Sequence, residues 1–266
     1  MSLETMKYEV SGGVGLVTFN RPDAANSMSP QCAAEFNALS REIEGDESIR
    51  SVVITGAGKM FCAGGDLAAF AKAGDQARSL LLEMTGDLHL GLSRLARMPA
   101  PVIAAVNGTA AGAGLSLVMS CDLAVSAERA VYTMAYTNAG LSPDGSSTYY
   151  MPRKIGDRRT RELMLTNRVL SSAEALDWGI VNQVVADDEA LDAALKLAEK
   201  LAAGPTEAFG KVKELLNSSF DNGLETQMEL EARAIAGLIQ TPDGQEGLHA
   251  FLGKRKPEFT GGSEGR

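Results

Sequence analysis

The sequence predicts an α/β fold in which parallel strands alternate with helices. Apolar runs with the length of a buried strand occur at residues 52–56 and 102–106. One helix is expected before the first of these strands, beginning at Ser29-Pro30 and running to about residue 44. A second helix is expected between the two strands, at residues 77–98, where leucines recur at helical spacing. Because consecutive strands separated by helices need crossover connections, we expect the strands to pair in parallel.

The flanking segments complete the expected order. Residues 7–20 are typical of a hairpin, with strands at 8–10 and 14–19 joined by Ser11-Gly12-Gly13. Further strands are expected near residues 123–126 and 131–134, and residues 189–259 are nearly all helix. A polar tail from Gly261 is expected to be disordered. We divide the chain into a core with the active site, residues 1–200, and a C-terminal helical region, residues 201–266.

Composition excludes several classes of protein. The chain has 266 residues, a net charge of −9 and 45% hydrophobic residues, which is typical of a globular protein without a surface for nucleic acid or anionic membranes. The three cysteines have no metal-ligand spacing, so we expect reduced thiols, no metal site and a cytoplasmic location. No signal peptide is visible. The uncharged stretch 98–121 contains two prolines and three glycines, which makes it a buried element rather than a membrane span.

Two turns with almost no side chains stand out. Residues 101–122 read as a strand, a break at Asn107-Gly108 and the turn Gly112-Ala113-Gly114, followed by an apolar helix from Leu115. The stretch Phe61-Cys62-Ala63-Gly64-Gly65-Asp66-Leu67 has the same character. Backbone N–H groups at such a strand-to-helix turn can be offered to a ligand at the positive end of the helix. Close packing alone would also explain small residues, and Asp66 could simply cap the helix that follows it.

Four further stretches accompany the two turns: Asn20-Arg21-Pro22, Ile54-Thr55-Gly56, Cys121-Asp122 and Trp178-Gly179. Together these motifs resemble the crotonase (enoyl-CoA hydratase/isomerase) superfamily over about residues 5–258. The resemblance implies a crotonase-like spiral of ββα units followed by a C-terminal helical region that builds homotrimers, often paired into hexamers. It also implies acyl-CoA thioester substrates, with coenzyme A belonging to the substrate rather than acting as a separate cofactor. In this family two backbone N–H groups polarise the thioester carbonyl, and the resemblance assigns them here to Gly65 and Ala113.

The resemblance also implies a path for coenzyme A. Phe251 and Lys254 resemble C-terminal residues that close over CoA, where a lysine can serve as a point charge for a phosphate. A solvated basic segment with Arg255 and Lys256 is the alternative for Lys254. The adenine and pantetheine would be lined by Ala24, Ala25, Ala63, Asp66 and Leu67.

Departures from the family pattern bear on the reaction. Hydratases of the family use two glutamates where this chain has Ser116 and Tyr136, so paired acid/base addition of water is disfavoured. Asp144 resembles the single acid of the double-bond isomerases, which moves a proton between C2 and C4 while the oxyanion hole holds the dienolate. Pro-Asp-Gly is also ordinary turn chemistry, and Asp144 could be a turn or cap residue only.

Two other functions are considered. The 4-chlorobenzoyl-CoA dehalogenases have a nucleophilic Asp at the position of Asp144, a His at His89 and a Trp at Tyr136, but Leu88 and Gly65 replace their bulky aromatic residues. His89 and Tyr136 are therefore candidate pocket residues, although a lone histidine on a helix is commonly solvated or packed. A non-catalytic binder of acyl-CoA or RNA is the remaining hypothesis, and RNA binding would need a basic stripe that an acidic chain lacks.

Overall fold

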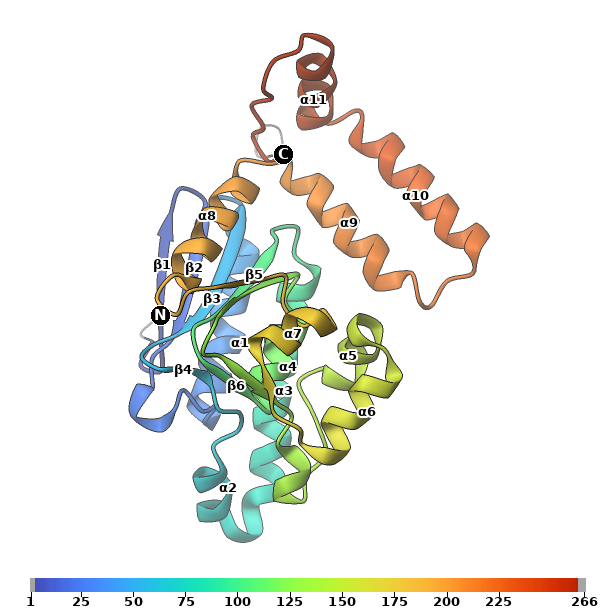
Figure 1. Ribbon diagram of the computed structural model, residues 1–266. Coiled ribbons are helices and arrows are strands. Elements are labelled where there is room, and N and C mark those ends of the chain that lie inside the picture. The colour runs from blue at the N-terminus through green and yellow to red at the C-terminus, as the bar shows by residue number, and fades with distance from the viewer. Residues whose placement is uncertain (1–2, 263–266) are drawn as a thin grey trace.

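The computed structural model describes residues 3–262, and its centre is a six-stranded sheet in the order β1-β2-β3-β5-β7-β10 (Figure 1). β1 pairs antiparallel with β2 as the expected hairpin, and the other neighbouring strands pair in parallel, as predicted. The strand bounds are Met6–Ser11, Val14–Phe19, Ser51–Gly56, Val102–Val106, Leu123–Ala127 and Gln183–Val185.

A second, four-stranded sheet has the order β4-β6-β8-β9. Its strands are short: Met60–Cys62, Thr109–Ala111, Val131–Thr133 and Leu170–Ser171. The chain passes three times from the large sheet to the small sheet and then into a helix, namely β3-β4-α2, β5-β6-α4 and β7-β8-α5. This repetition is the expected spiral of ββα units. The helices are α2 (Leu67–Ala73), α4 (Ala113–Ser120) and α5 (Ser147–Ile155).

Alternation along the central strands builds two hydrophobic cores. Val52 and Ile54 of β3 face one core, which also contains buried residues of α1 (Pro30–Gly45) and α3 (Ala77–Arg97). Val53 faces the opposite core, which contains Ala194 and Ala198 of α8 (Ala190–Ala202). Successive side chains of a strand point to opposite faces, so a continuous apolar run is required where both faces are covered.

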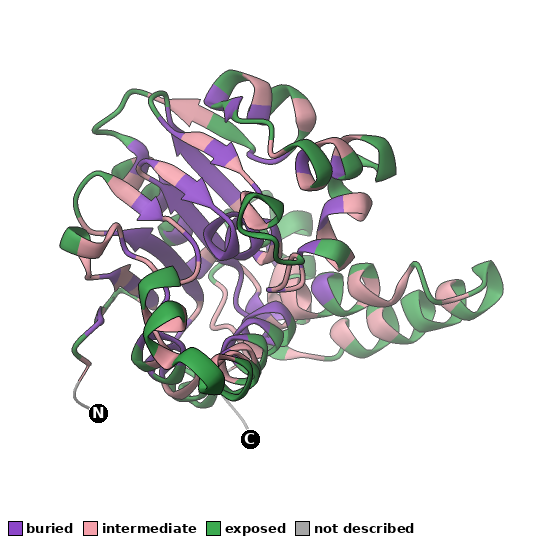
Figure 2. Ribbon diagram, turned by 90° about the horizontal axis from the view of Figure 1, so that it is seen from below, coloured by how far each residue is buried: buried purple, intermediate pink, exposed green. Residues whose placement is uncertain are grey.

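The C-terminal helices lie apart from these cores. α9 (Thr206–Ser218) and α10 (Leu224–Leu238) project as a pair to the right, and α11 (Pro242–Leu252) lies at the top of Figure 1. Figure 2 shows buried residues concentrated in the sheets, whereas the projecting pair is largely intermediate or exposed. Among residues 3–262, no helix is long and apolar enough to cross a membrane. The remaining helices are α6 (Asp157–Thr166) and α7 (Ser172–Trp178), with 3-10 turns η1 (Pro22–Ala24), η2 (Gly74–Gln76) and η3 (Tyr136–Ala139).

Two local expectations are corrected. The apolar helix begins at Ala113 rather than Leu115. Gly114, which was expected in the turn, lies inside α4 at a position that requires glycine, because a Cβ would stand 2.3 Å from the carbonyl oxygen of Cys62. The tail expected to be disordered from Gly261 begins as ordered chain. The buried Asp243 carboxylate accepts hydrogen bonds from Thr260 N at 2.7 Å and Gly261 N at 2.8 Å. The rest of that expected tail, residues 263–266, lies outside the described residues.

Candidate active site

The site is built from the same position in three successive repeats. β6 pairs in parallel with both β4 and β8, so the segments that follow these strands lie side by side. The first segment holds Gly64 and Gly65, the second Gly112 and Ala113, and the third Tyr136 and, further along, Asp144. A Cβ added to Gly64 would lie 3.4 Å from Ala113 N, and one added to Gly112 would lie 3.9 Å from the Tyr136 ring. The folding therefore brings the two predicted turns together and places Tyr136 beside them.

Gly65 and Ala113 offer unused backbone donors. Within residues 3–262, neither N–H donates to a protein acceptor, although the neighbouring Asp66 N donates to Met28 O at 2.9 Å and Gly112 N donates to Thr133 O at 3.0 Å. Ala113 is the first residue of α4, where N–H groups have no partner in the helix and the helix dipole is positive. Both donors are thus free to bind an oxygen with partial negative charge.

Asp66 is a helix cap in the structure. Its Oδ1 accepts a hydrogen bond from Ala69 N at 3.2 Å, and its Oδ2 pairs with Arg21 Nη2 at 3.0 Å. These contacts fix the start of α2 directly after Gly65. The capping interpretation is therefore correct, and a direct contact of Asp66 with CoA stays a prediction.

The loop at residues 20–28 lies against the first turn. Ala63 N donates to Ala25 O at 3.1 Å, and Met28 N donates to Gly64 O at 2.8 Å. Ala24 closes η1 just before Ala25, so these alanines are held beside Ala63. The predicted CoA residues of this region are therefore neighbours, and Leu67 at the start of α2 is 55% exposed.

Asn26 is a structural residue of this site that the sequence analysis missed. It is 1% exposed with φ +53°, its Oδ1 accepts from Arg21 N, and its Nδ2 donates to Ala57 O and Met60 O. Asn26 thus connects the loop to β4. A signal was available, because asparagine tolerates the left-handed conformation that tight loops need.

Asp144 lies at the end of a chain of hydroxyl groups. Tyr136 Oη donates to Asp144 Oδ1 at 2.5 Å and lies 3.2 Å from Ser116 Oγ. Burial, followed by the negative charge of Asp144, raises the pKa of Tyr136 above its ordinary value. Tyr136 is therefore a protonated donor at neutral pH. The two positions that lack glutamate are joined by hydrogen bonds to the one predicted acid.

His89 reaches the same segment from α3. Its Nε2 accepts a hydrogen bond from Gly145 N at 3.2 Å. Gly145 and Ser146 both have left-handed φ angles, +60° and +66°, so the chain turns sharply directly after Asp144. His89 thus supports the turn that carries Asp144, as a residue at the site rather than one buried in the core.

A cavity of about 1280 Å³ opens beside this turn. His89 and Leu92 of α3, the segment with Asp144 and Gly145, and residues of α9 and α10 line it. Asp144 therefore has the Tyr136 hydroxyl on one side and an open volume on the other. This volume is large enough to receive an acyl group.

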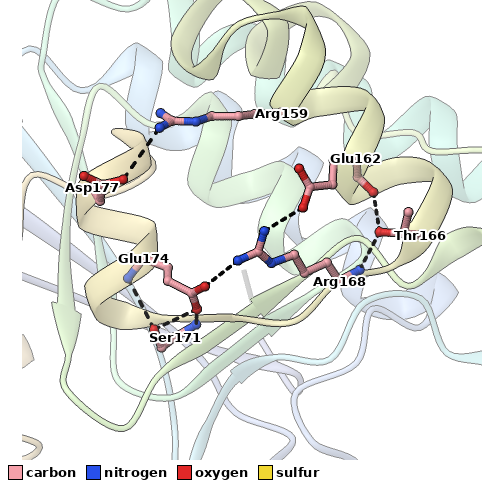
Figure 3. A network of polar contacts seen from close by, with 7 residues as sticks. All are labelled: Arg159, Glu162, Thr166, Arg168, Ser171, Glu174 and Asp177. Atoms are coloured by element: carbon pink, nitrogen blue, oxygen red, sulfur yellow. Dashed lines mark hydrogen bonds and ion pairs between the residues drawn. The ribbon is translucent and has the colours of Figure 1, made fainter.

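The outer wall of the third segment is a polar network (Figure 3). Arg168 bridges Glu162 of α6 and Glu174 of α7, with both contacts at 2.6 Å. The neighbouring Asn167, which the sequence analysis also missed, is the left-handed C-cap of α6. Its Nδ2 donates to Thr137 Oγ1 at 2.5 Å, and its carbonyl accepts from Thr133 Oγ1 at 3.1 Å. Asn167 therefore holds the chain on both sides of Tyr136.

Phe251 and Lys254 are not brought to the two turns within one chain. Phe251, on α11, is 81% exposed, and Lys254 follows the helix with φ +50°. Figure 1 places α11 at the opposite end of the molecule from α2. Their role in CoA binding stays a prediction.

Comparisons with known proteins agree on one family. Residues 9–262 match the model of the family described as enoyl-CoA hydratase/isomerase. The chain is 38% identical to 1,2-epoxyphenylacetyl-CoA isomerase of Escherichia coli K12, covering 97% of this chain and 99% of that protein. It is 34% identical to 4-chlorobenzoyl coenzyme A dehalogenase-2 of Arthrobacter sp., covering 94% and 91%. The crystal structure of an enoyl-CoA hydratase from Polaromonas sp. JS666 superposes with a TM-score of 0.91 at 35% identity, covering 96% of this chain and 99% of that one.

Proposed function

Since this chain belongs to the enoyl-CoA hydratase/isomerase family, we propose that it is an acyl-CoA isomerase that converts 3-enoyl-CoA to 2-enoyl-CoA. The observation that carries this proposal is the single carboxylate of Asp144, bound by Tyr136, whose ring lies beside the turn that carries the free N–H of Ala113. Asp144 removes a proton from C2 and returns it at C4. The reaction needs no resident cofactor, because CoA is part of the substrate.

The two turns stabilise the intermediate of this reaction. Gly65 N–H and Ala113 N–H bind the thioester oxygen, which gains negative charge as the proton leaves C2. One such preorganised donor contributes on the order of 3–4 kcal/mol to the stability of the transition state in other enzymes. Backbone donors need no side chain, which fits the small residues on both turns.

The surroundings of Asp144 favour isomerisation over hydration. The hydratases that this chain resembles use two glutamates for the acid/base addition of water, whereas here Ser116 and Tyr136 supply neutral hydroxyl groups 3.2 Å apart. Neither can hold a water as a general base at neutral pH. One carboxylate is sufficient to move a proton between two carbons of the same substrate.

The 34% identity to a dehalogenase supports a second candidate. In that reaction Asp144 would displace chloride from an aromatic ring, and His89 would have to accept a proton from the water that hydrolyses the resulting aryl ester. The hydrogen bond from Gly145 N occupies the lone pair of His89 Nε2, so the proton of a neutral ring lies on Nδ1. A ring in this state has no free lone pair to accept a proton from water. We therefore rank this reaction second.

The remaining interpretations concern binding and assembly. CoA lies along Ala24, Ala25, Ala63, Asp66 and Leu67, and the acyl group enters the cavity beside Asp144. The chain works as a homotrimer or hexamer in the cytoplasm. In that assembly Phe251 and Lys254 close over the CoA of a neighbouring copy, which fits their exposure and their separation from the turns of their own chain.

Turnover of 3-enoyl-CoA to 2-enoyl-CoA, followed by absorbance beside hydration of 2-enoyl-CoA, tests the proposal. Asp144→Ala is expected to lower kcat for isomerisation by roughly 10³-fold, because general acid–base catalysis is lost. Asp188→Ala, at an exposed position before α8, is the control and keeps wild-type turnover.

Hydration that survives Asp144→Ala would contradict the mechanism and favour a hydratase. Two further substrates separate the other candidates. Activity on 4-chlorobenzoyl-CoA with release of chloride would establish the dehalogenase reaction. Conversion of 1,2-epoxyphenylacetyl-CoA would extend the isomerase to the substrate named for the Escherichia coli relative.

A further inference from the structure

Tyr136 stands between Ser116 and Asp144, in contact with both. We propose that Tyr136 is the positioning residue of Asp144: its hydroxyl holds Oδ1 and leaves Oδ2 as the atom that takes the substrate proton. This inference rests on the proposed function, because it assigns a role to a residue of the same site. It concerns the geometry and charge of Asp144 before substrate binds.

The direction of the hydrogen bond follows from the chemistry of the groups. An ionised carboxylate can only accept, so Tyr136 Oη donates to Asp144 Oδ1. Ser116 Oγ lies 3.2 Å from Tyr136 Oη and 3.2 Å from Gly112 O, so its single proton is donated to one of these two acceptors. Within the described part of the chain, Asp144 Oδ2 accepts no hydrogen bond, so the two oxygens of the carboxylate are not equivalent.

The phenol is fixed well enough to orient its partner. Tyr136 N donates to Met134 O at 2.6 Å, and Leu141 N donates to Tyr136 O at 3.1 Å. Asn167 holds the neighbouring Thr137, and the ring edge approaches Gly112. A group held at its backbone and along its ring keeps its hydroxyl in one place, so the hydrogen bond selects one orientation of Asp144.

The backbone around Asp144 does not select that orientation. Ser147 Oγ donates to the carbonyl of Asp144 at 2.9 Å, and His89 accepts from Gly145 N. These bonds fix the main chain and leave the carboxylate free to rotate about its side-chain torsions. In residues 3–262 the Tyr136 hydroxyl is the group that the structure shows bound to the carboxylate.

Replacing Tyr136 by phenylalanine changes no other charged group near Asp144. His89 on α3 and Tyr136 on η3 are the titratable neighbours of Asp144, and the cavity beside it is lined by further charged side chains of α3, α9, α10 and the turn between α9 and α10. These are Arg97, Glu207, Lys211, Glu214, Asp221 and Arg233. A substitution that removes one hydroxyl leaves all of them unchanged.

Tyr136→Phe tests the proposal with two measurements. Loss of the fixed orientation lowers kcat for isomerisation by roughly 10- to 100-fold, whereas KM stays unchanged within about twofold. Ser116→Ala keeps the donor and lowers kcat by less.

A measurement without substrate separates this proposal from the proposed function. Carbon-13 NMR of protein labelled at aspartate carboxyl carbons, recorded at one neutral pH, observes the Asp144 carboxylate, whose signal is identified by its loss in Asp144→Asn. In Tyr136→Phe this signal is expected to move from its wild-type position, because Oδ1 has lost its hydrogen-bond donor. This readout stands even if the enzyme does not isomerise 3-enoyl-CoA.

Tyr132→Phe is the matched control, because it removes another buried phenol hydroxyl, bound to Ser126 Oγ at 2.6 Å. It is expected to leave the Asp144 signal and the kcat for isomerisation unchanged. An unmoved Asp144 signal in Tyr136→Phe overturns the proposal, as does an equal movement of that signal in Tyr132→Phe. If Tyr136→Phe does not fold, the Asp144 signal of the wild type is compared in H2O and D2O, and the absence of a deuterium isotope shift from a bound hydroxyl overturns the proposal.

Discussion

Two glycines determine where the backbone donors of the site point. Gly64 has φ +98° and Gly112 has φ +51°, conformations that side chains rarely adopt. A Cβ on Gly64 would also approach the carbonyl oxygen of Ala111 to 3.0 Å. Each glycine directly precedes a donor residue, Gly65 or Ala113, so a change of its backbone angles rotates the N–H that should meet the thioester.

Gly64→Ala is expected to impair both stability and catalysis. The positive φ and the contact with Ala111 O should cost about 1–3 kcal/mol of unfolding free energy, measured by urea denaturation. The rotated donor should lower kcat for isomerisation at least tenfold. Gly86→Ala is the control: it lies inside α3 with nothing within 4 Å of an added Cβ, and should gain up to about 1 kcal/mol. Wild-type turnover in Gly64→Ala would show that the φ angle of Gly64 does not determine the orientation of the Gly65 N–H.

At the scale of elements, the short η3 turn is held from outside the site. Its first residue is Tyr136, and Ala135 before it has φ +54°. Asn167 binds Thr137 in η3 and Thr133 at the end of β8, while the Arg168 network keeps α6 and α7 in place. The position of the phenol therefore depends on a helix C-cap some thirty residues further along the chain.

Asn167→Gly removes the side-chain hydrogen bond to Thr137 and keeps the left-handed backbone conformation. Glycine keeps the left-handed C-cap, so the unfolding free energy should fall by only about 1 kcal/mol for the lost hydrogen bonds. The kcat for isomerisation should fall about three- to tenfold, less than in Tyr136→Phe, because η3 gains freedom. Asn167→Ala should be less stable than Asn167→Gly in thermal melts, since alanine disfavours positive φ. Equal kcat in Asn167→Gly and wild type would show that the Asn167 side chain is not needed to hold η3 in place.

The helices and strands could be predicted from the sequence more completely than the contacts between them. Residues 52–56 and 102–106 were predictable because a strand buried on both faces is a continuous apolar run. The cap at Asp66 was predictable from its place before a helix. The three-residue strands β4 and β6 were not, because such short strands have no periodicity and exist through pairing with distant segments.

The same division holds for the candidate site. Gly65, Ala113 and Asp144 were predicted from motifs, and the structure places their three segments side by side. The bond from Tyr136 to Asp144 could not be read from the sequence, because it depends on how the third segment folds back. The contacts of Phe251 depend on what covers an exposed helix, which one chain does not contain.

At the scale of the whole molecule, the C-terminal helices present an apolar stripe to solvent. Leu224, Met228, Ile235 and Ile239 recur on one face of α10 and its end, and are 69%, 56%, 71% and 44% exposed. α10 has no buried residue in the single chain. Exposed apolar patches of this kind mark interaction surfaces, which fits the proposed homotrimer or hexamer.

Light scattering after size exclusion tests the assembly. The wild-type mass is expected to be three or six times the 28.0 kDa of one chain. Met228→Lys with Ile235→Lys should shift it toward the monomer, because charges on this face cannot be buried without partners. Glu231→Lys, an exposed charged position of the same helix, is the control for added positive charge. A monomeric wild type would contradict the proposed assembly.

The three ββα units contribute different groups to the candidate site. The first two units contribute the main-chain donors of Gly65 and Ala113, whereas the third contributes the side chains of Tyr136 and Asp144. Main-chain donors persist through most amino-acid replacements, provided that the turn glycines remain. The polarising half of the site can thus be inherited unchanged while residues 136–147 diversify. Such modularity offers a physical reason why one family contains proteins named as hydratases, isomerases and dehalogenases.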